Sequence, residues 1–279
     1  MAAPAASSTA ITGTSAPVGE LLRAWRQRRS LSQLELALDA DVSSRHVSFL
    51  ETGRARPSRA MVLRLAEHLE IPLRERNALL LAAGYAPAFA ERALDSEQME
   101  PVRAALARFL RAHEPFPAVV IDRRHDLLDA NDAVALLTAG VDAELLEPPA
   151  NVLRIALHPR GLAPRVRNLG EWSAHLLRGL RREAAATGDP ALGRLHDELA
   201  SYPGVELDTA HEQAAGSEVL APLRLLAGDG EELSFFSTIS TFGTALDITL
   251  AELSIEAFYP ANAATAERLL REIGAAGGG

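Results

Sequence analysis

The chain has 279 residues, 48% of them hydrophobic, which is enough for two domains with packed cores. It contains no cysteine, which excludes disulfides, thiolate zinc sites and a cysteine nucleophile and favours a cytoplasmic protein. No apolar run reaches the roughly 18 residues that a transmembrane helix needs, so we expect no membrane partner.

The net charge of −9 is unevenly distributed. Residues 1–92 hold 12 Arg against 9 acidic residues, whereas residues 93–279 hold 16 Arg against 28 acidic residues. The first part can therefore approach phosphates, which would repel the second part. Residues 1–16 are mainly Ala, Ser, Thr, Pro and Gly without charge, which predicts a disordered tail rather than a signal peptide.

Five short helices are predicted between residues 17 and 92. Leu22 and Trp25 belong to the apolar face of the first helix. Ser32 and Glu35 form a capping box, which starts the second helix at Ser32. Ser43 and Ser58 are good N-caps for the third and fourth helices, and Pro72 opens a fifth that ends near Gly84. These signals predict a small helical domain over residues 17–92.

Two of these helix starts lie close together, with arginines just beyond the second helix. The stretch from Leu31 to Pro57 therefore resembles the helix-turn-helix of lambda-type phage repressors and of the XRE family, and the resemblance covers residues 17–84. It implies DNA binding, which we favour over a merely solvated bundle. The implied DNA-binding residues are Gln33, Ser43, Ser44, Arg45, His46, Ser48, Phe49, Arg54 and Arg56.

The resemblance also implies roles for these residues. Gln33 would contact a phosphate, Arg54 and Arg56 would bind the backbone, and Ser44, Arg45 and Phe49 would face base edges. Arg45 can pair bidentately with guanine, and a phosphate contact is its alternative. His46 lies on the helix surface or faces a phosphate, and Phe49 contacts a thymine methyl or packs locally. Arg26 and Glu51 would form a partly buried ion pair. Asp41 stands where many relatives have glycine in the turn, and aspartate tolerates the left-handed conformation.

A second domain is predicted over residues 97–273. An amphipathic helix around residues 102–110 precedes strands at Phe116–Asp122 and Asp126–Ala130, and Asn131 is expected to cap the next helix. Helical stripes follow over residues 173–184 and 192–199. The later pattern predicts strands at Val219–Leu226, Glu232–Thr241 and Leu250–Tyr259, with a hairpin turn at residues 228–230 and a closing helix over residues 261–273. The fold class is therefore α+β, with a five-helix bundle followed by a PAS-like antiparallel sheet carrying helices.

The opening of this domain at Ala118–Asp122 and Asn131, the segment Asn151–Arg154 and the order of the late strands resemble the MmyB-type ligand-binding domain. That domain follows an XRE-type helix-turn-helix in many bacterial regulators. The resemblance implies a PAS-like fold, and some relatives hold a fatty acid in the core.

No catalytic constellation is visible. The eight histidines show no metal-ligand spacing, and no P-loop, dinucleotide fingerprint or Gly-x-Ser-x-Gly motif occurs. We therefore expect no metal, no cofactor and no enzyme activity. An enzyme fused to a helix-turn-helix is the rival interpretation, which lack of turnover of a bound ligand would exclude.

A cavity between the sheet and the helix that carries Trp172 is the expected ligand site. Each group of candidate residues also has an alternative interpretation. The aromatic residues would then belong to an ordinary hydrophobic core, and the Ser/Thr run from Ser237 to Thr244 would lie on the surface. The charged candidates would be solvated loop residues. His158, Arg160 or the hydroxyl run would orient a polar or carboxylate end of the ligand. The candidate ligand-binding residues are Phe116, His158, Arg160, Trp172, Leu176, Phe235, Thr241 and Phe242.

The sequence thus predicts a cytoplasmic, homodimeric, sequence-specific DNA-binding regulator. A small apolar or acidic ligand, fatty-acid-like by the resemblance, would bind the second domain and modulate DNA affinity. The alternative is a ligand-independent DNA-binding protein whose second domain only dimerises. A cavity in the core of that domain distinguishes the two.

Overall fold

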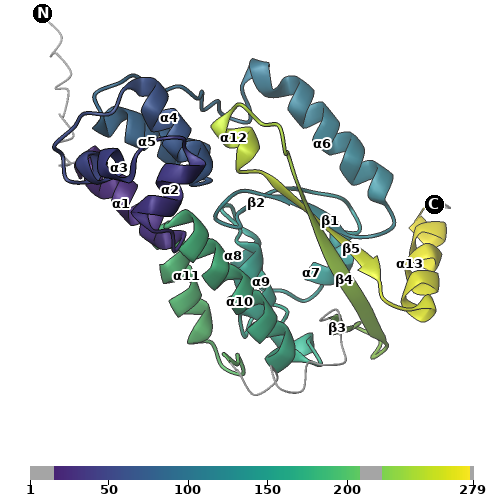
Figure 1. Ribbon diagram of the computed structural model, residues 1–279. Coiled ribbons are helices and arrows are strands. Elements are labelled where there is room, and N and C mark those ends of the chain that lie inside the picture. The colour runs from purple at the N-terminus through teal and green to yellow at the C-terminus, as the bar shows by residue number, and fades with distance from the viewer. Residues whose placement is uncertain (1–15, 208–221, 277–279) are drawn as a thin grey trace, which may run out of the picture. The chain divides into compact units, whose positions relative to one another are not determined.

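The computed structural model describes residues 16–207 and 222–276, which divide into two compact units between Phe89 and Ala90 (Figure 1). The predicted tail, apart from Ala16, lies outside the described residues, and so do residues 219–221 of a predicted strand. The expected fold class is confirmed, because a unit of five helices is followed by a unit with an antiparallel sheet and helices.

The first unit consists of the five predicted helices. They are α1 (Val18–Arg28), α2 (Gln33–Asp39), α3 (Ser44–Glu51), α4 (Arg59–His68) and α5 (Leu73–Ala82). The hydroxyls of Ser32, Ser43 and Ser58 each accept a hydrogen bond from the backbone N–H three residues later, at 3.1, 3.1 and 3.2 Å. These bonds satisfy N–H groups that have no partner within the helix, so the three predicted helix starts are confirmed.

The apolar faces of these helices form one core. Leu22, Leu36, Leu50 and Leu65 are buried in it, together with Trp25 at 5% exposure. In the turn between α2 and α3 the residue at position 41 is left-handed, with a φ of 51°, as expected for an aspartate in place of glycine.

The second unit contains eight helices, two 3-10 turns and five strands among its described residues. Its helices are α6 (Glu100–His113), α7 (Val134–Thr138), α8 (Ala143–Leu146), α9 (Val152–Leu157), α10 (Leu169–Thr187), α11 (Pro190–Ala200), α12 (Ile248–Ala251) and α13 (Ala263–Ala276), with 3-10 turns at Glu97–Met99 and Ala163–Arg165. Its strands are β1 (Ala118–Ile121), β2 (Leu127–Ala130), β3 (Leu223–Leu226), β4 (Glu232–Thr241) and β5 (Ser254–Pro260).

The five strands form one antiparallel sheet in the order β2-β1-β5-β4-β3. The register places Val119 of β1 opposite Glu256 of β5, and Ser237 of β4 opposite Phe258 of β5. Because side chains alternate along a strand, Val119, Glu256 and Phe258 share one face of the sheet.

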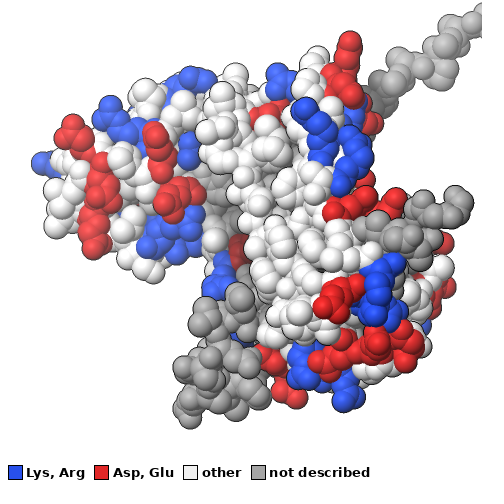
Figure 2. All heavy atoms as spheres, turned by 90° about the vertical axis from the view of Figure 1, so that its right-hand side faces the viewer, with Lys and Arg blue, Asp and Glu red and all other residues white. Residues whose placement is uncertain are grey.

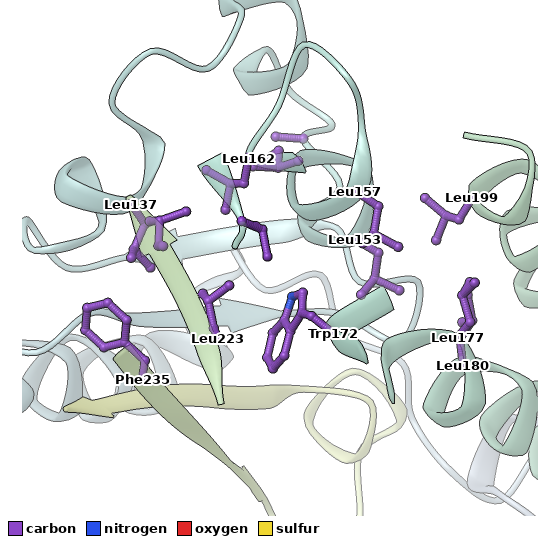
Figure 3. Close-up of a cluster of buried hydrophobic side chains, with 14 of the residues drawn as sticks. Leu137, Leu153, Leu157, Leu162, Trp172, Leu177, Leu180, Leu199, Leu223 and Phe235 are labelled. Atoms are coloured by element: carbon purple, nitrogen blue, oxygen red, sulfur yellow. The ribbon is translucent and has the colours of Figure 1, made fainter. Parts of the chain in front are cut away.

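Each face of the sheet has its own apolar cluster. One face, with Leu223 and Phe235, packs against residues of α7, α9, α10 and α11, and Figure 3 shows Trp172 of α10 among the leucines of this cluster. The other face, with Ala118 and Val120, packs against α6 through Leu106. In Figure 1, α6 and α10 accordingly lie on opposite sides of the sheet.

Two predictions about local structure are wrong. Asn131 does not cap a helix: its Oδ1 accepts from Ala118 N at 3.0 Å, and its Nδ2 donates to Phe116 O at 2.8 Å and Leu110 O at 3.2 Å. A buried amide is satisfied by these long-range backbone partners, which the sequence does not reveal. The strand predicted from residue 250 starts only at Ser254, because Asp247 caps the short helix α12 through Thr249 N.

Candidate DNA-binding surface and ligand cavity

Helix α3 exposes one polar face. Val47 and Leu50 are buried in the core, whereas Ser44 and Arg45 are exposed. At about 100° per residue, Arg45 lies on the side of the helix opposite Val47 and Leu50, and Ser44 lies at the edge of the buried face. The side chains that the sequence assigns to base edges are therefore free to meet a partner.

Phe49 of α3 links two of the predicted DNA-binding arginines. The guanidinium carbons of Arg45 and Arg54 lie 5.2 and 5.9 Å from the centroid of its ring, within the range of cation–π attraction. In the described part of the chain neither arginine forms an ion pair. The Phe49 ring thus contacts the guanidiniums of both arginines, which lie close together on the same surface of the first unit.

The other predicted DNA-binding residues surround this group in different ways. The Ser43 hydroxyl is engaged as the cap of α3, and the Nε2 of Gln33 donates to Glu51 Oε2 at 2.8 Å. Arg56 is exposed, whereas His46 and Ser48 are half-buried on α3. The nine predicted residues thus lie on α2, on α3 with its N-cap Ser43, and on the segment that follows α3.

The expected ion pair between α1 and α3 is present and buried. Arg26 Nε lies 2.6 Å from Glu51 Oε1, and Arg26 Nη2 donates to Glu51 Oε2 at 2.9 Å, with side-chain exposures of 10% and 3%. Arg26 Nη1 also donates to Leu31 O at 2.7 Å, ahead of α2. One guanidinium therefore ties α1 to α3 and to the segment that starts α2.

In the second unit, a cavity of about 90 Å³ lies between the sheet and the helices that cover it. β1 and β5 contribute Val119, Glu256 and Phe258, and α10 contributes Trp172 and Leu176. The rest of the lining is apolar apart from Thr138: it consists of Leu127, Val134, Leu137, Leu146, Val152, Leu153, Ile155, Ala156, Leu162 and Leu223. Such a lining favours an apolar group.

Two of the eight predicted ligand-binding residues, Trp172 and Leu176, line this cavity. The aromatic candidates Phe116, Phe235 and Phe242 lie elsewhere: Phe235 is fully buried in the core beside the cavity, and the other two are half-buried at the margins of the apolar clusters. Thr241 is exposed at the end of β4.

The two charged candidates also lie outside the cavity lining. Arg160 Nη1 pairs with Asp142 at 2.7 Å and with Glu144 at 2.9 Å, and the ring of His158 contacts that of Tyr202 edge-on, with centroids 5.0 Å apart. A carboxylate in the cavity would therefore not meet the cations that the sequence suggested for it.

Glu256 is a lining residue that was not predicted from the sequence. It is the only charged residue among those that line the cavity, and none of the described residues forms an ion pair with it. Burial raises the pKa of its carboxyl, while a hydrogen bond from Ser237 and the charge of His125 act in the opposite direction. The sequence does contain a signal for this residue: Glu256 is the single acid in the strand segment Ser-Ile-Glu-Ala-Phe and shares a strand face with Phe258. That face can be recognised as the inner one only when the register of the strand is known.

Three wider features of the described residues concern surface charge, metal ligands and membrane-spanning helices. Figure 2 shows a face on which described acidic and basic side chains are interspersed around an uncharged area, rather than a continuous basic surface. The described residues contain no group of three His, Cys, Asp or Glu side chains placed to hold a metal ion. None of the described helices is long and apolar enough to cross a membrane.

Both units match known protein families. Residues 17–79 match a helix-turn-helix domain, and residues 102–271 match the MmyB-like transcription regulator ligand binding domain. The chain belongs to the MmyB-like family. A helix-turn-helix unit followed by this ligand-binding domain is the domain order of a DNA-binding transcription regulator, and neither matched family is one of enzymes.

Among solved structures, this MmyB-like regulator is similar to an RNA-binding Light-Oxygen-Voltage receptor at 15% sequence identity and a TM-score of 0.27. The match covers 92% of this chain and 62% of the receptor chain, so the regulator spans less than two thirds of that chain's length. A comparison with curated proteins finds no match.

Proposed function

We propose that this regulator binds a pseudo-palindromic operator as a homodimer and that a small apolar molecule in the cavity of the second unit changes its affinity for DNA. The observation that carries the proposal is the apolar cavity beneath Trp172 in a domain of a ligand-binding family. A ligand alters DNA affinity only if it binds one arrangement of the protein more tightly than another, and a site inside a packed core is sensitive to such rearrangement.

The DNA side of the proposal rests on α3. Arg45 reads a base edge, with guanine as its preferred partner, while Arg54 and Arg56 bind phosphates. Gln33 contacts a phosphate as well, and Ser44 and Phe49 face neighbouring bases. The exposed and unneutralised guanidiniums of Arg45 and Arg54 beside the Phe49 ring support these roles.

The dimer is proposed because one helix-turn-helix unit buries too little surface for typical operator affinity. Two units bound to half-sites about one helical turn apart, ~10 bp, would supply the missing contacts. Light scattering at micromolar concentration should give the mass of a dimer, and footprinting should give two protected half-sites. A monomer that protects a single half-site would exclude this arrangement.

The ligand side is tested by filling the cavity. Leu176→Trp places a larger side chain on the wall of the cavity, whereas Leu128→Trp changes a residue of β2 that is 43% exposed and does not line it. The operator is first selected from random DNA with the purified protein. Operator affinity is then measured for both variants and the wild type, with and without a small-molecule extract of cells.

We expect the extract to change the operator affinity of the wild type and of Leu128→Trp, but not of Leu176→Trp, with all three proteins folded. If no extract component shifts operator affinity or melting temperature of the wild type, the second unit acts without a ligand. The protein would then be a DNA-binding regulator whose second unit only dimerises.

A further inference from the structure

We propose that the cavity of the second unit selects an apolar ligand that carries a cationic amine, with the carboxylate of Glu256 as its counter-ion. This inference rests on the proposed ligand-binding function and names the chemical class of the ligand. It differs from the fatty-acid-like ligand that the resemblance implied.

Glu256 occupies a central position in the sheet. It lies in the middle of β5, between Val119 of β1 and Ile239 of β4, on the face that lines the cavity. The residue as a whole is half-buried, and it is part of the cavity lining. A ligand in the cavity would therefore lie against this carboxyl group.

Glu256 has no counter-ion in contact with it among the described residues. No arginine or histidine of that part of the chain forms an ion pair with Glu256, and no cationic side chain lines the cavity. A hydrogen bond from Ser237 and the charge of His125, whose own ion-pair partner is Glu183 at 2.9 Å, lower the pKa of Glu256, but burial has the larger effect and raises it. A carboxyl group kept in apolar surroundings without a cation is destabilised in its ionised form, and a bound ammonium group would remove that penalty.

The rest of the wall is almost entirely apolar. Thr138 is the only other residue in the lining with a polar aliphatic side chain, and its hydroxyl already donates to Val134 O at 3.2 Å. The remaining lining offers apolar contact to a short hydrocarbon group. The cavity is partly open, with Leu146 of its lining 38% exposed, so its volume of about 90 Å³ takes the inner part of such a group while the rest extends outward. For comparison, an enclosed apolar cavity of roughly 150 Å³ holds a whole benzene ring.

The cavity offers no site for an anionic group. Arg160, the arginine that the sequence suggested for a ligand carboxylate, pairs with Asp142 and Glu144 and does not line the cavity. An anionic ligand would meet Glu256 with no cation to offset the like charge or the loss of water. The wall thus discriminates against a carboxylate and favours an amine.

The test uses three probes with the same hydrocarbon chain: hexylamine, hexanol and hexanoate. Their dissociation constants are measured at neutral pH by ligand-observed NMR with the full-length protein. We expect hexylamine to bind at least about tenfold more tightly than either of the other two. In Glu256→Gln this preference should disappear, while hexanol affinity stays within about twofold of wild type.

Two control variants separate the possible causes. Glu97→Gln removes an exposed carboxylate of the same unit, and it should leave the amine preference unchanged. Leu176→Trp should weaken all three probes, because it fills the space that their common chain occupies. The folding of each variant is checked by its melting temperature.

The outcomes are distinct. If hexanol or hexanoate binds the wild type as tightly as hexylamine, the amine selectivity is overturned while the ligand site stands. If hexylamine is preferred equally by wild type and Glu256→Gln, Glu256 is not the counter-ion and the inference fails. If no probe binds, this inference fails. If Leu176→Trp also leaves the response of operator affinity to the cell extract unchanged, the ligand-binding part of the proposed function fails with it.

Discussion

Arg26 of α1 and Glu51 of α3 form two parallel hydrogen bonds, of 2.6 and 2.9 Å, inside the first unit. Both side chains are nearly inaccessible to solvent, and Gln33 of α2 adds a third hydrogen bond to the same carboxylate. The Glu51 carboxylate thus ties α1 to the two helices, α2 and α3, that carry most of the proposed DNA-binding surface.

Removing one partner of this pair should strongly destabilise the first unit. Arg26→Met leaves the buried Glu51 carboxylate without its cation, and we expect a loss of about 3–5 kcal/mol in unfolding free energy. Arg59→Met, which changes an exposed arginine of α4, should cost less than about 0.5 kcal/mol. Denaturant unfolding, with hydrogen exchange of peptides from α1 to α3, measures both. A melting temperature of Arg26→Met within a degree or two of wild type would contradict the prediction.

The same pair should make the first unit sensitive to acid. Burial raises the pKa of Glu51, but the hydrogen bonds from Arg26 and Gln33 together with the charge of Arg26 outweigh it, so the pKa lies below its ordinary value. A carboxyl group with a lowered folded-state pKa stabilises the fold above its unfolded pKa, and this contribution is lost as pH falls through the folded pKa. Unfolding free energy should therefore fall below about pH 4. The double variant Arg26→Met/Glu51→Leu should show a weaker fall, and an unchanged acid profile would contradict the prediction.

Arg45 and Arg54 should affect DNA binding differently. Arg45→Ala should cost about 1–3 kcal/mol on the operator and relax specificity at one base pair. Arg54→Ala should weaken operator and scrambled DNA alike and flatten the salt dependence of binding. Titrations of both DNAs at several salt concentrations test this. An equal loss on both DNAs for Arg45→Ala would remove Arg45 from base recognition.

Two glycines should respond to alanine with opposite signs. A Cβ at Gly19 would lie 2.4 Å from Leu50 O, so Gly19→Ala must push α1 away from α3 and should cost about 1–3 kcal/mol. Gly179 in α10 has no atom within 4 Å of a Cβ position, so Gly179→Ala should stabilise its helix by about 0.5–1 kcal/mol. Hydrogen exchange of α1 and α10 reports the two effects separately. Equal effects would mean that the close approach at Gly19 does not limit packing.

Asn131 should be sensitive to the loss of its donors. Asn131→Asp keeps the acceptor for Ala118 N but leaves Leu110 O and Phe116 O facing a carboxylate, so we expect a loss of more than about 2 kcal/mol. Asn262→Asp is the control, because its Oδ1 caps α13 by accepting from Thr265 N and aspartate keeps that bond. Chemical denaturation measures both variants. A tolerated Asn131→Asp would show that these backbone groups find other partners.

The sequence by itself determined the elements whose signals are local. Three helix starts are marked by serines, Ser32, Ser43 and Ser58, because each hydroxyl can accept a hydrogen bond from the backbone N–H three residues later. Donor and acceptor lie within four residues of sequence, so the signal can be recognised without the fold. The long strand β4 and the hairpin after Leu226 were likewise predictable, since alternation and a Gly-Asp-Gly turn lie within the segment. The place of the cavity, between the sheet and the helix of Trp172, followed from the expected order of elements.

Only the tertiary structure decided which side chains meet. Asn131 is of a residue type that often caps helices, but its hydrogen-bond acceptors, Leu110 O and Phe116 O, come from an earlier part of the chain. Arg160 resembles a ligand contact until its pairing with Asp142 is seen. Glu256 stands in a short strand whose start at Ser254, and hence whose inward face, depends on the cap at Asp247 and on pairing with β1. A shift of one residue in that register reverses the face of every side chain, so the charge in the cavity could be assigned only when the sheet was assembled.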